Sequence, residues 1–319
     1  MKKTFDVVGK RKGFYIFSCA VIVLSIILTF VLGANIAIEF KGGTIITYSY
    51  EGTISDSAVS TAATNAVGQP ANATLGESLA DGMKTVSVSF PSSTGLSAEV
   101  QSQLTEALNT EFADNALEIY NSQDVNPTTG KGFFGKCLVA VAFSAVVMIL
   151  YIGLRFRKIG GWIAGCCSVI ALIHDMFFVY ACFIICRFDI DSNFMAVLLT
   201  ILGYSINATI IIYDRIRENR TICGETASLD ELVNMSVTQS FGRSVHTTVT
   251  TVVAMASICI VALVGGVESI LSFAFPLVIG LLAGVYSSNC IAPTLWTVWQ
   301  GAVDKKHKKT IDNTKKNRK

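Results

Sequence analysis

The chain has 319 residues, of which 51% are hydrophobic and 15% are charged, with a formal net charge of +2 at pH 7. Its mean hydropathy is +0.54, and this balance excludes a water-soluble domain with an ordinary charged surface. We therefore expect a membrane protein.

Six apolar segments are each long enough to cross a bilayer as a helix, which takes about 20 residues. They cover residues 13–33, 133–154, 161–186, 194–213, 247–265 and 270–298. An even number of spans returns the chain to the side on which it began. The first span is similar to a secretory signal, but its apolar run of about 20 residues exceeds the usual 7 to 15, so we expect a retained anchor.

The charges are distributed unevenly along the chain. Residues 35–131 contain three lysines, no arginine and eleven carboxylates, whereas basic residues crowd both ends and two short links. Because basic segments stay on the cytoplasmic side, we expect both termini in the cytoplasm and the acidic block outside. The expected organisation is a cytoplasmic N-terminus (1–12), a first span (13–34), an outer domain (35–131), five further spans (132–299) and a basic cytoplasmic tail (300–319). From about residue 304 the tail is expected to be disordered and to lie near anionic lipid.

The outer block has the pattern of a small α+β domain. It predicts strand 44–50, helix 55–67, strand 71–78, strand 84–90, helix 97–112 and strand 117–121. Alternation such as "TVSVSF" indicates the strands, and Ser-led starts indicate the helices. This order is typical of a ferredoxin-like domain. The stretch "DVNPTTGKG" (124–132) is expected to be an irregular link back to the membrane.

The cysteines and histidines do not indicate a metal centre. All nine cysteines fall in apolar segments or cytoplasmic links, so no disulfide framework is expected, and no spacing with histidine suggests zinc. We expect no metal, no cofactor and no nucleic-acid partner. An enzyme such as an intramembrane hydrolase is not expected either, because no acid pair or nucleophile with a base occurs at workable helical spacing.

Asp175 lies near the middle of the third span, where an ionisable side chain costs at least about 2.5 kcal/mol and is a functional candidate. Ser168, Gly165 and Gly161 share its helical face, and small residues mark the side where helices approach closely. We therefore expect Asp175 to face the bundle interior, as a titrating group or as a structural acceptor. His174 is rotated by about 100° from Asp175, so we expect it to point elsewhere and not to cooperate with that acid.

The fourth span carries a polar turn within "GYSINATIIIYDRIREN". Asn207 shares a face with Gly203 and Asp214, and a residue that both donates and accepts is more often glue between membrane helices than chemistry. Asp214 ends the span beside two arginines, a pattern typical of a solvated ion pair.

The fifth and sixth spans carry stripes of small and hydroxyl residues. They are Thr247, Thr250, Thr251, Ala254 and Ser257 in the fifth span, and Gly280, Gly284 and Ser287 in the sixth. Both stripes indicate tight helix packing. Arg243, just before the fifth span, can extend to the cytoplasmic surface or be drawn inward by an acid.

Several motifs resemble, in order and spacing, the signatures of the SecF family of bacterial protein-export subunits. They are "AIEFKGGT" (37–44), "YIGLRFRK", "ALIHD", "LLTILGYSINATIIIYDRIREN", "RSVHTTVTT" and "GVYSSNCIAP". The resemblance runs from about residue 5 to 299, and the outer domain matches by pattern alone. It implies half of a transporter of the resistance-nodulation-division (RND) type in the bacterial inner membrane. The fold it implies is an all-α bundle of six membrane helices, with an extracytoplasmic ferredoxin-like domain between the first two spans.

The resemblance also implies which residues line an ion or proton pathway. The candidates in this chain are Asp175, His174, Tyr204, Ser205, Asn207 and Arg243. The family usually has Gly-Tyr-Ser-x-Asn-Asp in the fourth span, and its final acid is held to carry a proton within the membrane. That position is Ala208 here, and an alanine cannot titrate.

For function, the resemblance implies a SecD partner that forms a twelve-span unit with this chain beside the SecYEG channel. The unit is implied to use the proton motive force, or sodium in some bacteria, to promote late steps in the export of a translocating polypeptide. A scaffold subunit without coupling is an alternative that Ala208 favours and that Asp175 and Arg243 oppose. A small-molecule pump of RND type is a third alternative.

Overall fold

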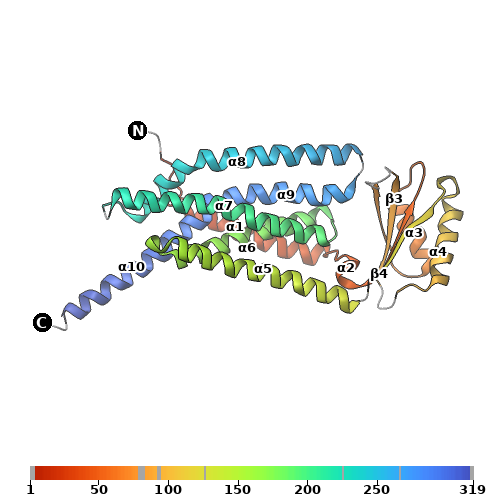
Figure 1. The fold of residues 1–319 in the computed structure, drawn as a ribbon, viewed down its shortest axis with the longest axis horizontal. Coiled ribbons are helices and arrows are strands. Elements are labelled where there is room, and N and C mark those ends of the chain that lie inside the picture. Colours follow the sequence, from red (N-terminus) through yellow and green to blue (C-terminus); the bar gives the residue numbers. More distant parts are fainter. Residues whose placement is uncertain are drawn as a thin grey trace.

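We describe the protein from a computed structural model, which describes residues 4–77, 83–91, 95–125, 127–224, 226–265 and 267–316. Long helices form a bundle, and a small domain with an antiparallel sheet lies at one end of it (Figure 1). The two ends of the described chain lie at the other end of the bundle, away from the sheet (Figure 1).

Among the described residues, six helices are long and apolar enough to cross a membrane, as the sequence predicted. Five are α1 (Arg11–Leu32), α5 (Pro127–Arg155), α6 (Gly161–Cys186), α7 (Ser192–Cys223) and α8 (Leu229–Gly265). The sixth consists of α9 (Glu268–Tyr286), a π-helical turn η3 (Ser287–Ile291) and α10 (Ala292–Lys316). In their apolar segments, 50% of α6 and 56% of α7 is buried, against 11% of α1 and α5. The centre of the bundle is therefore formed by α6, α7 and the sixth span, of whose apolar segment 44% is buried.

Several helices extend beyond their predicted ends. α7 continues to Cys223, where Gly224 with a φ of 61° ends it, and α8 begins as early as Leu229. α10 continues as a helix to Lys316, so the prediction of a disordered tail is wrong. The predicted irregular link is also wrong, since α5 begins at Pro127, a residue favoured at the first helical position. Hydropathy locates the edge of the lipid, whereas helix ends depend on caps and tertiary contacts.

The extension of α8 binds the N-terminal segment. Asn234 Oδ1 accepts hydrogen bonds from the backbone N–H groups of Val7 at 2.9 Å and Val8 at 3.0 Å, and its Nδ2 donates to Asp6 at 3.0 Å. Both valines are buried in the same apolar core as the ends of α5, α7 and α10. This part of α8 therefore holds the N-terminal segment against the bundle.

The predicted close approach on the glycine face of α6 is confirmed against α5. A Cβ atom at Gly161 would lie 2.5 Å from the carbonyl oxygen of Gly153, and one at Gly165 would lie 3.1 Å from that of Ile149. Only a residue without a side chain allows the two backbones to come so near each other. A short 3-10 turn, η2 (Arg157–Ile159), joins the two helices.

The small domain contains the six predicted elements in the predicted order. They are β1 (Gly43–Ser49), α3 (Asp56–Val67), β2 (Asn72–Glu77), β3 (Lys84–Pro91), α4 (Ala98–Glu111) and β4 (Glu118–Val125), with a 3-10 turn η1 (Ala113–Asn115) before β4. All neighbouring strands are antiparallel, in the order β2-β3-β1-β4. Each end lies within one residue of its prediction except the end of β4, which runs four residues further.

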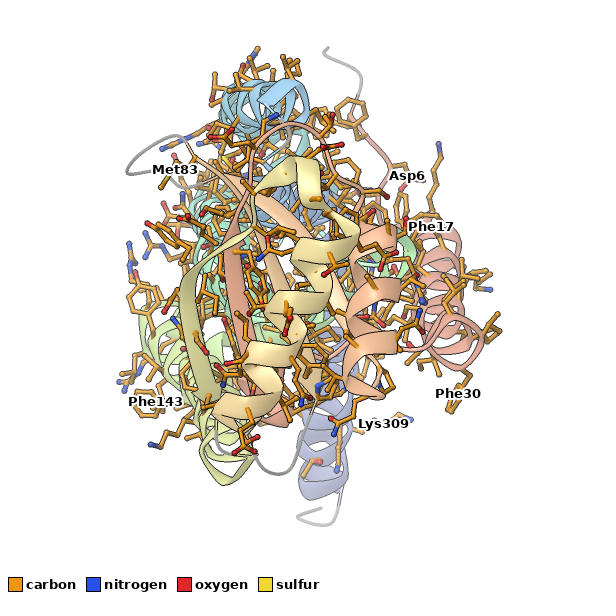
Figure 2. The ribbon with its side chains drawn as sticks, turned by 90° about the vertical axis from the view of Figure 1, so that its right-hand side faces the viewer. Asp6, Phe17, Phe30, Met83, Phe143 and Lys309 are labelled. Atoms are coloured by element: carbon orange, nitrogen blue, oxygen red, sulfur yellow. The ribbon has the colours of Figure 1, made fainter. Side chains whose placement is uncertain are left out.

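Alternation along the strands gives the sheet one apolar and one polar face. Ile46, Tyr48 and Val86 are fully buried in a core that includes side chains of α3 and α4. Thr47 and Ser87 point to the other face, where their hydroxyls lie 3.0 Å apart. The two helices lie on the side of the sheet away from the bundle (Figures 1 and 2). The polar face of the sheet is therefore turned toward the bundle.

A short helix, α2 (Ile38–Lys41), joins the first span to the sheet. Phe40 is buried, and its ring lies 5.7 Å from that of Phe133 and 5.2 Å from that of Phe134 at the start of α5. Gly42 and Gly43 follow with φ angles of 87° and 145°, which side chains disfavour. The "AIEFKGGT" motif thus fixes the sheet domain on α5.

Candidate functional site

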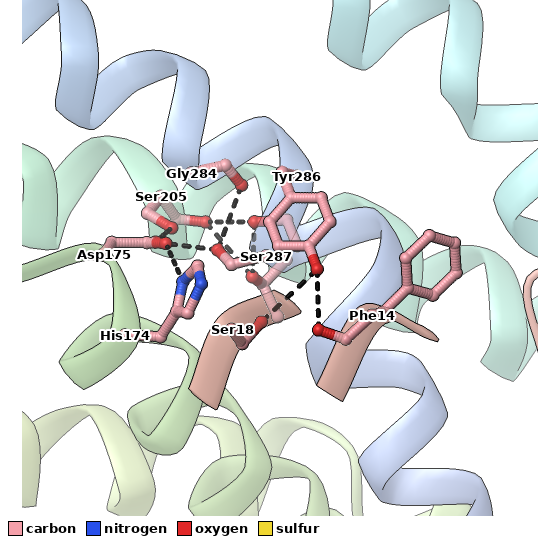
Figure 3. A network of polar contacts seen from close by, with 10 residues as sticks. Phe14, Ser18, His174, Asp175, Ser205, Gly284, Tyr286 and Ser287 are labelled. Atoms are coloured by element: carbon pink, nitrogen blue, oxygen red, sulfur yellow. Dashed lines mark hydrogen bonds and ion pairs between the residues drawn. The ribbon is translucent and has the colours of Figure 1, made fainter. Parts of the chain in front are cut away.

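Asp175 lies on α6 in the interior of the bundle and is 0% exposed, as predicted. Its Oδ2 accepts a hydrogen bond from Ser205 of α7 at 2.6 Å and another from Ser287 of η3 at 2.7 Å. Its Oδ1 lies 3.0 Å from Nδ1 of His174 (Figure 3). Three elements that are distant in sequence therefore meet at one carboxyl group.

The prediction that His174 points away from Asp175 and forms no pair with it is wrong. Neighbouring residues on a helix diverge by about 100° at the backbone, but the imidazole reaches around to the carboxyl group. Its ring lies against Phe178 and Tyr286, with centroids 4.7 and 5.6 Å away. Its Nε2 is buried and has no hydrogen-bond partner among the described residues. The two side chains can therefore exchange a proton through one hydrogen bond.

Hydroxyl groups extend the site along α7 and η3. Ser288 donates to the carbonyl oxygen of Ser205 at 3.1 Å, and its Oγ lies 2.9 Å from that of Thr209. Ser287 and Ser288 both reach the α6–α7 pair from the π-helical turn, a kind of turn that often occurs at functional sites. Ser288 and Thr209 could not be predicted as part of the site, because a π turn cannot be told from an α-helix by residue spacing.

Gly284 allows α9 to come close to the site. A Cβ atom at this position would lie 3.2 Å from Ser205 Oγ and 3.7 Å from Asp175 Oδ2. The tight packing predicted from Gly280, Gly284 and Ser287 is therefore confirmed at Gly284. Ser287 has a further role as a donor to the acid, which the stripe of small residues did not predict.

Tyr286 connects the site to the first span. Its hydroxyl donates to the carbonyl oxygen of Phe14 at 2.9 Å and lies 3.3 Å from Ser18 Oγ, while its ring contacts His174 (Figure 3). Tyr286 was not among the predicted site residues, although a tyrosine beside two serines in "GVYSS" is an unusual group for an apolar span. The site thus includes side chains or backbone from α1, α6, α7, α9 and η3.

The polar turn of α7 does not form one wall, because successive helix residues point in different directions. Ser205 faces Asp175, whereas the hydroxyl of Tyr204 donates to Thr248 of α8 at 3.1 Å. Asn207 is exposed. Of the predicted pathway residues, the structure therefore brings together Asp175, His174 and Ser205, and it leaves Tyr204, Asn207 and Arg243 outside their network.

Small and polar residues also face away from the rest of the chain. They are Gly203 and Asn207 on α7, and Arg243, Thr247, Thr250, Ala254 and Ser257 on α8. We call these two sets the outward stripes. In the described part of the chain Arg243 forms no ion pair, so none of the acids described there draws it inward.

Ala208 is buried, with 8% of its surface exposed. Among the described residues, Asp175 is the only fully buried carboxylate. Asp214, by contrast, lies 2.6 Å from Arg217 and is 49% exposed, which is the solvated pair that the sequence predicted. No three His, Cys, Asp or Glu side chains gather in the described ranges. The site therefore brings together a carboxyl group and an imidazole, each of which can bind a proton, with hydroxyls that can donate and accept hydrogen bonds.

Comparison with known proteins covers both parts of the molecule. The family described as "Protein export membrane protein SecD/SecF, C-terminal" matches residues 104–302. The chain is 34% identical over 317 residues to protein translocase subunit SecF of Alicyclobacillus acidocaldarius, with 96% of each chain covered. It is 33% identical over 308 residues to protein translocase subunit SecDF of Bacillus subtilis, with 95% of this chain covered.

The same relationship is visible in three dimensions. The crystal structure of SecDF from Thermus thermophilus, described as a translocon-associated membrane protein, matches with a TM-score of 0.77 and 26% identity over 94% of this chain. The chain spans 39% of the length of each of these two SecDF proteins. Since it also matches a SecF subunit over 96% of both chains, the chain belongs to the SecF family of protein translocase subunits.

Proposed function

We propose that this chain acts with a SecD subunit and uses the proton motive force, or a sodium gradient, to promote late steps of protein export through the SecYEG channel. The names of the relatives support the pairing, because SecDF of Bacillus subtilis is a longer single chain of which this one matches 39%. The observation that carries the coupling is the fully buried Asp175, which joins α6, α7 and η3.

Protonation of Asp175 would change how these elements contact each other. As a carboxylate, Asp175 accepts hydrogen bonds from two serines and one imidazole. A protonated carboxyl group becomes a donor at one oxygen, so one of these partners must turn away or accept instead. Because Ser205 and Ser287 belong to different elements, each change of proton would alter the packing of α7 against η3.

The energy available is sufficient for such a movement. A charge that crosses a potential of 100 mV gains about 2.3 kcal/mol, so one or two protons supply several kcal/mol and shift a two-state equilibrium usefully. The base of the sheet domain is bound to the start of α7, since Glu39 Oε2 accepts from the backbone N–H of Ser192 at 3.1 Å and Ala37 N–H donates to Ile190 at 3.1 Å. We propose that movement of α7 tilts the sheet domain through these contacts.

The sheet domain is the part that we propose to hold the emerging polypeptide. Its strand order β2-β3-β1-β4, with both helices on one face, supports the assignment to the ferredoxin-like class. The sheet domain, which belongs to the acidic block 35–131, lies at one end of the bundle, and both described chain ends lie at the other (Figure 1). With the positive-inside rule, this arrangement supports an inner-membrane protein with cytoplasmic termini.

The outward stripes are the surface that we propose for SecD. An amide that faces lipid leaves its hydrogen bonds unmade, which is costly, and Asn207 is exposed in the middle of α7. A Cβ atom at Gly203 would meet no other atom within 4 Å. Small residues and polar groups of this kind are typical of contacts between membrane helices.

A scaffold subunit without coupling is the second candidate function, and Ala208 is the observation that favours it. Asp175 separates the two candidates, because a scaffold does not depend on a proton there. The test is export into inverted membrane vesicles that contain SecD and SecYEG, with and without a proton gradient. A parallel series with a sodium gradient identifies the coupling ion.

Asp175→Asn is the informative variant for this test, and Asp214→Asn is its matched control at a solvated acid. We expect Asp175→Asn to lose the stimulation by the gradient and to keep the export that ATP drives alone. Asp214→Asn should keep both the stimulation by the gradient and the export that ATP drives alone. Full gradient stimulation in Asp175→Asn would rule out coupling through this acid and favour the scaffold.

A further inference from the structure

A basic cavity lies between the end of α5, the turn η2 and the last turns of α7. Its volume is about 630 Å³, within the usual range of ligand sites. The charged and apolar side chains that line it include Arg155, Arg157, Lys158, Arg217, Leu154 and Ile222. These segments form the end of the bundle opposite the sheet domain (Figure 1).

Two of the four cations are held in place by the fold. The guanidinium groups of Arg155 and Arg217 lie 5.4 and 5.7 Å from the centre of the Phe156 ring, which is fully buried. Both also pair with Asp214, at 3.6 and 2.6 Å. The positive edge of the cavity is therefore organised before any ligand arrives.

The other two cations are not neutralised by any carboxylate that the structure describes. Within the described ranges neither Arg157 nor Lys158 forms an ion pair. Glu218 also lines the cavity, but it is bound to Arg215 at 2.6 Å. The cavity thus keeps an excess of positive charge and presents Arg157 and Lys158 to an anion.

The surroundings of the cavity are apolar and exposed. Leu150, Tyr151 and Leu154 on α5 are 46%, 48% and 53% exposed, and Ile222 on α7 is 72% exposed. In a membrane bundle these side chains of α5 face the hydrocarbon. A ligand that places a phosphate on the cations can therefore lay an acyl chain along α5, which a free anion cannot do.

We propose that this cavity binds the phosphate headgroup of an anionic phospholipid. Arg157 and Lys158 contact the phosphate, Arg155 and Arg217 complete the positive rim, and the exposed face of α5 contacts an acyl chain. Basic pockets between membrane helices are known to bind such headgroups. This site lies apart from Asp175 and does not depend on proton coupling.

The test is native mass spectrometry of the purified full chain with equal amounts of phosphatidylglycerol and phosphatidylcholine. The variant is Arg157→Gln with Lys158→Gln, and its matched control is Lys305→Gln with Lys306→Gln, which removes the same charge from exposed positions of α10. We expect the first variant to lower phosphatidylglycerol retention by about thirtyfold, since two basic side chains at the headgroup level are removed. The control should retain it, and both should keep the melting temperature of the wild type.

A second arm adds millimolar inorganic phosphate to distinguish a lipid from a free anion. We expect phosphate not to displace the bound lipid, because it lacks the acyl contact. Equal retention of phosphatidylglycerol in both double variants would overturn the proposal. Displacement by phosphate, or equal retention of the two lipids by the wild type, would also overturn it.

Discussion

Two polar regions of this bundle differ in whether their polar groups find hydrogen-bond partners within the chain. Around Asp175, a carboxyl group, an imidazole and several hydroxyls are buried, and the acid has all its partners within the chain. Along the outward stripes, Asn207 and Arg243 are exposed, with open space beside Gly203. The difference separates a site that one subunit can assemble alone from a surface that a second subunit must complete.

Removing the central acid should have the largest effect on the isolated chain. Asp175→Leu leaves Ser205, Ser287 and His174 without their acceptor, so we expect a loss of about 3 kcal/mol in the free energy of unfolding. Asn207→Leu, at an exposed position, should change stability by less than about 0.5 kcal/mol. Thermal unfolding of both variants in detergent measures this contrast. Similar losses in the two variants would show that the regions do not differ.

Adding a methyl group to a glycine inside the bundle, and to one on an outward stripe, should give the next largest contrast in stability. A Cβ atom at Gly280 would clash with Ile201 and Val179, so Gly280→Ala should cost about 2 kcal/mol by overpacking. The new methyl group of Gly203→Ala would meet no described atom within 4 Å and should leave the stability of the chain unchanged or slightly raised. The comparison is made again after co-expression with SecD, where Gly203→Ala should lower the yield of co-purified SecD. An equally destabilised Gly203→Ala chain without SecD would contradict this assignment.

The hydroxyls of the π-helical turn should contribute less to stability than Asp175 or the close packing at Gly280. Ser288→Ala removes the bond to Ser205 and the contact with Thr209, and we expect a loss of about 1 kcal/mol. Ser257→Ala, on an outward stripe, is the matched control and should have no measurable effect on the isolated chain. Denaturation curves that show no difference between the two serines would mean that the contacts of Ser288 do not stabilise the chain.

The smallest effect is expected from an acid outside both regions, and it is a change in how stability depends on pH. Asp191 precedes α7 and accepts from the backbone N–H of Phe194 at 3.1 Å. Burial raises the pKa of Asp191 above its ordinary value of 3.8, the bond from Phe194 partly offsets this shift, and the carboxylate of Glu39 adds to it. The folded chain therefore holds this proton more tightly than the unfolded chain. Its contribution to stability is lost as the pH rises from 3.8 through the raised pKa.

Asp191→Asn keeps a good cap for α7 and removes this titration. We expect its melting temperature to fall less than that of the wild type between pH 4 and pH 7, by an amount equivalent to less than about 1 kcal/mol. Melting curves at several pH values measure the slope. An unchanged slope would mean that Asp191 titrates at the same pH in both states.

Much of the fold follows from local patterns. The strands and helices of the sheet domain lie close to their predicted places, because alternation such as "TVSVSF" and Ser-led starts are local signals. The apolar segment 247–265 lies within α8, but the helix itself begins much earlier, at Leu229. Its first part carries charges that hydropathy assigns to a loop, although Asn234 on it binds the N-terminal segment.

The candidate site could be predicted only in part. A lone acid in an apolar span identifies Asp175, because burying a charge is costly. The partnership with His174 depends on the reach of an imidazole, and those with Ser287 and Ser288 depend on a π turn. Such details are set by packing in three dimensions, and residue spacing does not contain them. The exposure of Asn207 likewise depends on how the helices pack, and residue spacing does not predict it.

Photocrosslinking from the middle of α7 tests the central claim most directly, that the outward stripes form a protein surface within the membrane. A benzoylphenylalanine is introduced at Asn207 in cells that also express SecD, with Phe143 on α5, which is 68% exposed, as the control position. We expect irradiation to crosslink SecD to the chain at position 207 and not at position 143. Crosslinks from 207 to lipid alone would contradict the account.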